Sequence, residues 1–150
     1  MSNYFEDIKA FHDKFGLRYD GPPRNLPDDI KAFRWKFLNE ELQEYKQGLI
    51  DNDIEQQFDA LIDLVYVALG TAYLSGMPFD RGWDIVQACN MAKVKAGPNG
   101  EGSKRGSPHD VIKPEGWVGP ERQLREALEL RAEAVEADMY QTRAAAAGHK

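Results

Sequence analysis

Residues 58–74 read FDALIDLVYVALGTAYL, and the only charged side chains in this segment are those of Asp59 and Asp63. Its length and its many apolar residues predict a helix that is covered on most of its faces. The two aspartates lie one helical turn apart and therefore share a face. Because almost every face of this helix is apolar, we expect both aspartates to point into a packed interior.

The helix expected before it carries a second acidic group, Glu40, Glu41 and Glu44. At about 100° per residue, Glu41 and Glu44 continue an apolar stripe formed by Ile30, Phe33 and Phe37. If the two helices pack antiparallel, the two acidic groups converge. Carboxylates that cluster away from water repel one another and lose their hydration, so such a group needs a bound cation. A set of oxygen ligands without His or Cys favours Mg²⁺, with Mn²⁺ as a substitute, over Zn²⁺.

The acidic residues also have an ordinary structural interpretation. Glu40, Glu41 and Glu44 could form a solvated face of a glutamate-rich helix. Asp59 would then stabilise the first turn of its helix, and Asp63 would accept a buried hydrogen bond. The apolar surroundings of the two aspartates favour the metal interpretation over this one.

The composition restricts the class of protein. A chain of 150 residues fits one domain, and its net charge of -6 disfavours binding to nucleic acid polymers or anionic membranes. The longest uncharged run, 64–79, is shorter than the roughly 20 residues of a membrane-spanning helix. Cys89 is the only cysteine, and the start of the chain lacks the pattern of a secretion signal. We therefore expect a cytoplasmic protein that does not associate with membranes.

Helical periodicity recurs along the chain, and no segment alternates long enough to predict a sheet, so the expected fold class is all-α. Helices are predicted over 4–15, 27–49, 53–75 and from Pro78 onward, and a thin apolar stripe predicts a further helix in the tail. On the fourth helix the expected stripe is Phe79, Trp83, Val86, Asn90 and Lys93. The Gly- and Pro-rich segment 96–120 is either a functional flap or disordered. We expect a catalytic domain over 1–120 that includes this flap, followed by a helical tail over 121–150.

Four segments in this order, NEELQEY, DALIDLVYVALGTAYLSG, ACNMAKV and DVIKPEGWVGP, resemble the all-α nucleoside triphosphate pyrophosphohydrolase superfamily. The similarity is to its MazG-like and phosphoribosyl-ATP-pyrophosphohydrolase-like members, and FHDKFGL resembles the N-termini of small members from bacteria and their phages. The resemblance covers about 11–120. It implies an antiparallel helical bundle that uses Mg²⁺ to cleave a nucleoside triphosphate between its α and β phosphates. The products would be a nucleoside monophosphate and pyrophosphate.

The resemblance also implies roles for the acidic residues. Glu41, Glu44 and Asp63 match metal-binding acids of the family, and Glu40 matches an additional acid that binds a further metal or orients the attacking water. The family's second acidic pair is usually ExxD, which would place an acid at Ala60. This chain has Asp59 instead, which keeps a carboxylate on the same helix face as a fifth metal ligand.

Several further residues are implied to bind the substrate: Asn90, Lys93, Lys104, Arg105, Lys113 and Tyr66. Asn90 and Lys93 match family residues that contact the sugar or the phosphates, and the flap cations would close over the phosphates. Tyr66 would hydrogen-bond a ligand carboxylate. The alternatives are that Lys93 favours the C-terminal end of its helix, that the flap cations only aid solubility, and that Tyr66 fills the core. Trp117 is expected to pack the flap down or to stack on a base, with packing favoured.

Three functional hypotheses follow. The first is a Mg²⁺-dependent pyrophosphohydrolase of ribo- or deoxynucleoside triphosphates, which works by in-line attack of a metal-activated water. The second is a phosphoribosyl-ATP pyrophosphohydrolase, and the third is a non-catalytic helical scaffold. No GxSxG motif or P-loop is present to suggest other hydrolases. Because the apolar helix over 58–74 needs cover, we expect a homodimer or homotetramer.

Overall fold

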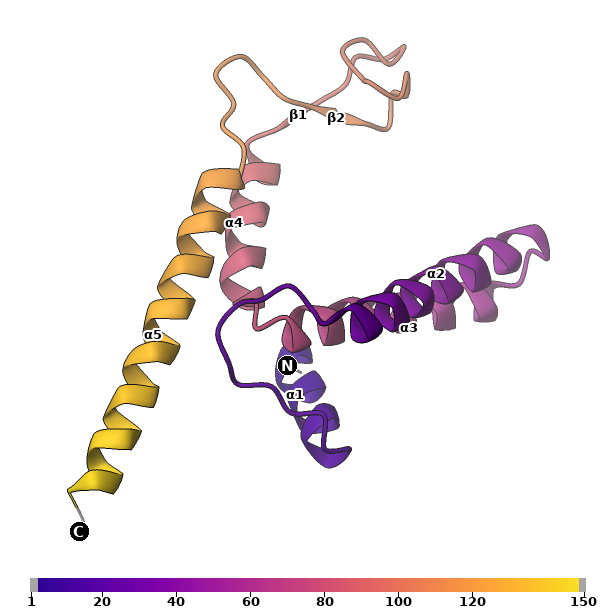
Figure 1. The fold of residues 1–150 in the computed structure, drawn as a ribbon. Helices are drawn as coiled ribbons and strands as arrows, with labels where there is room; N and C mark the ends of the chain where they lie inside the picture. The colour runs from indigo at the N-terminus through magenta and orange to yellow at the C-terminus, as the bar shows by residue number, and fades with distance from the viewer. Residues whose placement is uncertain (1–2, 149–150) are drawn as a thin grey trace. The chain divides into compact units, whose positions relative to one another are not determined.

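The structure, a computed structural model, describes residues 3–148. Within them the elements are α1 (Tyr4–Lys14), α2 (Asp28–Ile50), α3 (Ile54–Leu74), α4 (Phe79–Met91), β1 (Val94–Lys95), β2 (Val111–Ile112) and α5 (Glu121–Ala147) (Figure 1). Helices make up 65% of the described residues, which confirms the predicted all-α class. The ladder of β1 and β2 was not predicted, because two residues per strand are too few to show an alternating pattern.

The described residues form two compact units. The first contains the residues up to Phe79 together with those from Leu128 onward, and the second contains Asp80–Ala127. The boundary expected at residue 120, between a catalytic domain and a tail, stays a prediction. Residues 1–2 and 149–150, the ends of those two predicted segments, lie outside the described residues.

The helix boundaries follow the local signals in the sequence. Asp53 caps α3, because its Oδ1 accepts hydrogen bonds from the backbone nitrogens of Glu55 and Gln56 at 3.0 Å each. Gly76, just after the end of α3, has a φ of 67°, which favours glycine. Pro27 stands at the N-cap of α2 before two acidic residues. The bounds predicted for these two helices are confirmed to within a residue or two.

Helices α2 and α3 form an antiparallel hairpin and pack side by side (Figure 1). Arg34 of α2 is only 8% exposed and binds across to α3: its Nε donates to Thr71 Oγ1 at 3.0 Å and its Nη2 to the Val67 carbonyl at 2.6 Å. A Cβ atom at Gly70 would lie 2.8 Å from Arg34 Nη2, so glycine leaves the space that the guanidinium occupies. The hairpin is thus joined by a buried cation whose hydrogen bonds are made within the fold.

Helix α1 packs against the C-terminal half of α3. The core of this contact consists of Phe5, Ile8, Leu69 and Tyr73. His12 of α1 is also buried, and its Nδ1 hydrogen-bonds the Ile8 carbonyl at 2.8 Å. The ring of His12 lies 4.8 Å from that of Tyr73, so this histidine is part of the core.

Helix α3 is the one helix among residues 3–148 that is long and apolar enough to span a membrane. That test considers length and composition only, and the core helix of a soluble protein also passes it. In this chain α3 packs against both α1 and α2 and accepts hydrogen bonds from Arg34. Only 33% of the residues in this apolar stretch of α3 are buried in the described structure.

The apolar stripes predicted from the sequence are wrong in part. On α2 the side chain of Phe33 is 59% exposed, and Arg34 is buried instead. On α4 the buried residues are Ile85 and Cys89, whereas Trp83 of the predicted stripe is 62% exposed. Both helices have apolar residues on more than one face, so periodicity alone could not select the covered one.

In the second unit, β1 pairs antiparallel with β2 and closes the loop between them. Within this loop the Asp110 carbonyl accepts a hydrogen bond from the Ala96 nitrogen at 2.9 Å, and Ser103 Oγ donates to Asp110 Oδ2 at 2.7 Å. The Gly- and Pro-rich segment therefore has a hydrogen-bonded structure of its own. Its function as a flap stays a prediction.

Candidate functional site

The candidate site lies where the C-terminal half of α2 packs against the N-terminal half of α3. Glu41 of α2 is only 7% exposed, and its Oε2 is buried with no hydrogen-bond partner within residues 3–148. A buried carboxylate oxygen without a partner is rare, because leaving such a group unpaired costs about 1–3 kcal/mol or more. Glu41 is therefore held in a position that the rest of the described fold does not stabilise.

Four other carboxylates surround Glu41: those of Glu44, Asp63, Glu40 and Asp59, in decreasing order of their effect. Burial raises the pKa of Glu41 above its ordinary value, and repulsion from these four groups raises it further. The two acidic groups singled out in the sequence thus converge on Glu41. This convergence follows from the antiparallel packing of α2 and α3.

The aspartates of α3 are not in a packed interior, and that prediction is wrong for the single chain. Asp59 and Asp63 are exposed, and so are Glu40 and Glu44. The neighbouring Phe58 is also 67% exposed, so this stretch of α3 is largely open to solvent within the described residues. A cleft of about 910 Å³ opens here, lined by Asp53, Glu55, Gln56, Phe58, Asp59 and Ile62.

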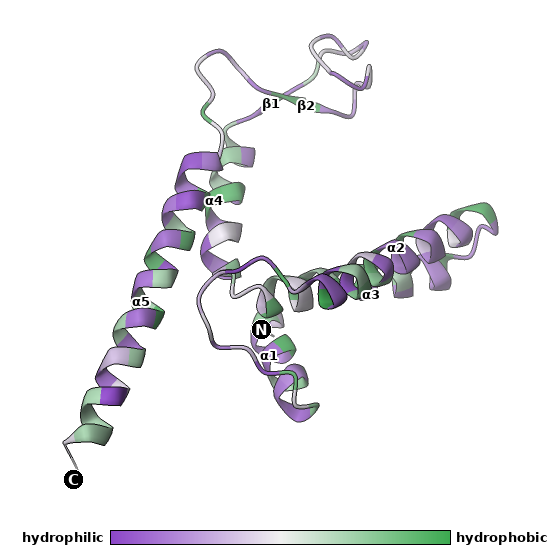
Figure 2. Cartoon of the chain, viewed as in Figure 1, coloured by the Kyte–Doolittle hydropathy of each residue, from purple (hydrophilic) through white to green (hydrophobic). Residues whose placement is uncertain are grey.

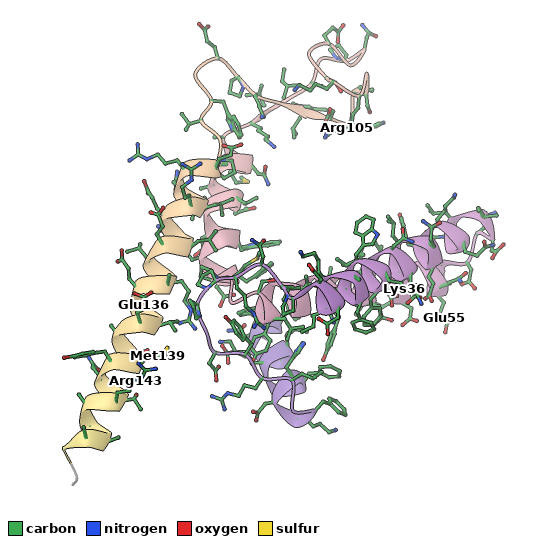
Figure 3. The ribbon with its side chains drawn as sticks, viewed as in Figure 1. Lys36, Glu55, Arg105, Glu136, Met139 and Arg143 are labelled. Atoms are coloured by element: carbon green, nitrogen blue, oxygen red, sulfur yellow. The ribbon has the colours of Figure 1, made fainter. Side chains whose placement is uncertain are left out.

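The carboxylates do not form a closed ligand set as they stand. Within the described part of the chain, no three acidic, His or Cys side chains are arranged to hold a metal ion. Glu40 instead forms an exposed ion pair with Lys36, whose Nζ lies 3.8 Å from Glu40 Oε1 (Lys36 is labelled in Figure 3). Such exposed pairs are weak, so Glu40 is available to other partners.

Three of the predicted substrate-binding residues come together in the second unit. Lys93 Nζ donates to Asn90 Oδ1 at 2.8 Å, and the same Nζ lies 5.6 Å from the ring centroid of Trp117. Lys113 Nζ lies 4.4 Å from that centroid. The indole Nε1 donates to the Cys89 carbonyl at 2.8 Å, which ties Trp117 to the end of α4.

The other predicted substrate-binding residues make different contacts. Arg105, in the loop between β1 and β2 (labelled in Figure 3), pairs with Asp110 at 3.3 Å. Lys104, the preceding residue, is exposed. The hydrogen bond from Ser103 is the main cause that lowers the pKa of Asp110. On α3, the ring of Tyr66 packs edge-on against that of Phe11 of α1, with the ring centroids 5.5 Å apart, and the Tyr66 side chain is 39% exposed. Its role as a substrate-binding or a core residue stays a prediction.

A comparison with protein families adds to this geometry. The family model described as phosphoribosyl-ATP pyrophosphohydrolase matches residues 8–90 of the chain. The chain belongs to the phosphoribosyl-ATP pyrophosphohydrolase family. This is a MazG-like family of the all-α nucleoside triphosphate pyrophosphohydrolase superfamily, so the predicted resemblance is confirmed. A search of curated proteins finds no match to this chain.

The family match covers the whole of the acidic group, from Glu40 to Asp63, and reaches Asn90. Lys93, Lys104, Arg105 and Lys113 follow the matched residues. Membership indicates a pyrophosphohydrolase enzyme, which acts on a small-molecule nucleotide. The acidic cluster, defined here as Glu40, Glu41, Glu44, Asp59 and Asp63, is therefore placed in the part of the chain that the family shares.

Sequence reasoning missed two features near these groups. Arg34 lies one turn after Ile30 and just under one turn before Phe37, so the sequence places a cation on the apolar stripe predicted for α2. A cation in that position indicates a buried side chain that forms hydrogen bonds. The contact of Lys93 and Lys113 with one indole could not be read from the sequence, because it depends on the fold of the loop after α4.

Proposed function

We propose that the protein is a Mg²⁺-dependent pyrophosphohydrolase that cleaves ribo- or deoxynucleoside triphosphates to the monophosphate and pyrophosphate. The observation that carries this proposal is the buried, unpartnered Oε2 of Glu41 among four further carboxylates, in a chain of a pyrophosphohydrolase family. Such an arrangement is costly in the absence of a cation and becomes favourable when one binds.

The donor set fits Mg²⁺, with Mn²⁺ as a substitute. All its atoms are carboxylate oxygens, which are the ligands that these hard cations prefer. Glu41 would provide the fixed oxygen, and the exposed side chains of Glu44, Asp59 and Asp63 are free to turn toward the ion. When bound, the metal supplies positive charge that offsets the negative charge of the phosphates during the reaction.

The residues of the chain itself would do the rest. We assign Glu40 to orient the attacking water for in-line displacement, either directly or by holding a further metal ion. Asn90, Lys93 and Lys113 would bind the sugar or the phosphates through hydrogen bonds and charge, and Lys104 and Arg105 would add charge from the loop. Tyr66 would hydrogen-bond a ligand carboxylate, although its ring packs against Phe11.

A pyrophosphate-release assay over canonical and modified nucleoside triphosphates, with Mg²⁺ or with EDTA, tests this proposal. We expect Mg²⁺-dependent release of pyrophosphate and of the monophosphate from at least one of them. Phosphoribosyl-ATP belongs in the same assay, because the family match favours it as a second candidate substrate. Release from phosphoribosyl-ATP alone would select the second candidate, and no release from any substrate would leave the scaffold hypothesis.

We also propose that the protein assembles into a homodimer or homotetramer in the cytoplasm. Large apolar side chains are exposed on the α2–α3 hairpin, among them Phe33, Trp35, Ile54, Phe58 and Val65. Figure 2 shows hydrophobic residues distributed along this hairpin. An exposed apolar surface of this kind is typical of a protein interface. Sedimentation velocity tests this: a monomer at all concentrations would contradict the proposed assembly.

A further inference from the structure

Two positively charged side chains of the second unit share a single aromatic ring. Lys113 Nζ lies 4.4 Å and Lys93 Nζ 5.6 Å from the ring centroid of Trp117. Both distances fall within the range of about 6 Å over which the ring quadrupole attracts a cation. Lys93 follows the end of α4 and Lys113 follows β2, so the indole brings together ammonium groups from two separate segments.

The ring itself is fixed in place. Its Nε1 donates to the Cys89 carbonyl at 2.8 Å, near the end of α4, and the side chain is half-buried. The backbone nitrogen of Trp117 also donates to the Pro114 carbonyl at 3.1 Å, which closes a turn over residues 114–117, and Lys113 directly precedes this turn. Lys93 is held in addition by Asn90 Oδ1 at 2.8 Å. The two ammonium groups are thus directed by contacts that do not depend on a ligand.

Two cations that share one ring repel each other. A nearby carboxylate, that of Asp110, attracts Lys93, but it is also paired with Arg105 at 3.3 Å and accepts a hydrogen bond from Ser103. Attraction to the ring offsets some of the repulsion, and an anion with several negative oxygens would offset the remainder. A polyphosphate chain is such an anion.

We propose that Trp117 is a positioning residue that holds Lys93 and Lys113 together so that they bind the polyphosphate chain of the substrate. This inference rests on the proposed function, because it takes a nucleoside triphosphate as the ligand. It assigns Trp117 a role through the lysines, and not through stacking on the base.

Calorimetric titration with inorganic tripolyphosphate in EDTA tests the positioning role, since without metal the acidic cluster cannot hold the anion. We expect Trp117→Leu to weaken binding on the order of tenfold, which is the size of a favourable cation–π pair. Trp117→Phe keeps an aromatic face and should lose less. Trp83→Leu, at an exposed tryptophan of the same unit, is the matched control and should bind as the wild type does.

A double-mutant cycle separates positioning from general support of the fold. In a Lys93→Met, Lys113→Met background, Trp117→Leu should cause no further loss, because the groups through which it acts are absent. An undiminished tenfold loss in that background, or no tripolyphosphate binding by the wild type, would overturn the inference. In turnover assays we expect a tenfold rise in KM with kcat within about twofold, as for an interaction made equally in the ground and transition states.

The two proposals fail in different ways. A wild type that binds tripolyphosphate through Trp117 but releases pyrophosphate from no nucleotide contradicts the proposed function only. A wild type that hydrolyses nucleotides while Trp117→Leu and Trp117→Phe keep the same tripolyphosphate affinity and the same KM contradicts the positioning role only.

Discussion

Two charged side chains of α2 are buried two turns apart, and they differ in their hydrogen-bond partners. Arg34 is 8% exposed and donates to Thr71 Oγ1 and to the Val67 carbonyl of α3. Glu41 is 7% exposed, its Oε2 has no partner within the described residues, and its pKa is raised by burial and by four other acids. The first charge is satisfied by the fold and the second is not.

We interpret this difference as one between a charge that stabilises the fold and a charge that binds a ligand. A buried cation with hydrogen bonds to the neighbouring helix contributes to the packing of the hairpin. A buried anion among like charges opposes folding, and we propose that Glu41 is retained because it binds a cation. The predictions below test whether Arg34 and Glu41 differ in this way, beginning with the largest expected effect.

Removing a carboxylate near Glu41 should abolish catalysis without unfolding the protein. We expect Glu44→Ala and Asp63→Ala each to lower turnover of the nucleotide found in the pyrophosphate assay by at least about a hundredfold, since the ion would lose a ligand. Thermal melting in EDTA should show both variants folded, because loss of a like charge relieves repulsion. Asp29→Ala, at an exposed acid of α2 outside both the acidic cluster and the cleft, is the control and should keep turnover near that of the wild type. Full activity in both cluster variants would refute the assigned site.

Removing Arg34, the buried charge that has hydrogen-bond partners, should change the stability of the fold and leave metal binding unchanged. We expect Arg34→Met to lower the free energy of unfolding by about 2–3 kcal/mol, because it removes two charged hydrogen bonds and leaves their acceptors near an apolar side chain. Urea denaturation measures this, and Lys31→Met, at an exposed position of the same helix, should change it by less than about 0.5 kcal/mol. The loss should be the same with and without Mg²⁺. An Arg34→Met variant as stable as the wild type would contradict the claim that Arg34 stabilises the hairpin.

Neutralising Glu41, the buried charge without a partner, should raise the free energy of unfolding, whereas the loss of Arg34 lowers it. Glu41→Gln keeps the shape of the side chain and removes its repulsion from the surrounding acids, so we expect it to stabilise the metal-free protein by about 1 kcal/mol at neutral pH. Glu40→Gln, at an exposed position, should give a much smaller change in the same denaturation experiment. A destabilised Glu41→Gln variant in EDTA would mean that the fold already satisfies this carboxylate.

The raised pKa of Glu41 gives a smaller, pH-dependent effect. The folded protein holds the proton of Glu41 more tightly than the unfolded chain does, so this group favours the folded state at pH values below the ordinary pKa of a glutamate, 4.5. That contribution is lost as the pH rises through the raised folded-state pKa. Glu41→Gln should therefore flatten the fall in metal-free stability over this window, measured by denaturation at a series of pH values. An unchanged slope would assign the pH dependence to other groups.

The sequence predicted the helices around the site well, because caps and punctuating residues are local. Asp53 and Gly76 mark the ends of α3 through interactions within a few residues, and the structure has both. The convergence of the acidic residues also followed from helical spacing once antiparallel packing was assumed. Both inferences need only the regular geometry of a helix.

The burial of individual residues could not be predicted in the same way. Asp59 and Asp63 were expected in the interior because their helix is apolar on almost every face. An apolar face is covered only where another element packs against it, and Phe58, next to Asp59, is exposed. Glu41 differs from its neighbour Glu40 only by its direction on α2. Which glutamate faces α3 depends on how the two helices pack, and this packing is set by contacts between residues that are far apart in the sequence.

The most direct test of the central claim is the thermal melting of the wild type and of Glu41→Gln with Mg²⁺ and with EDTA. A cation that binds only the folded state, at a concentration 100 times its Kd, stabilises by about 2.7 kcal/mol, which corresponds to a rise in Tm of about 5–10 °C for a chain of this size. We predict this rise for the wild type and little or none for Glu41→Gln. An unchanged Tm in the wild type, or an equal rise in both proteins, would contradict the claim that Glu41 is buried in order to bind a metal ion.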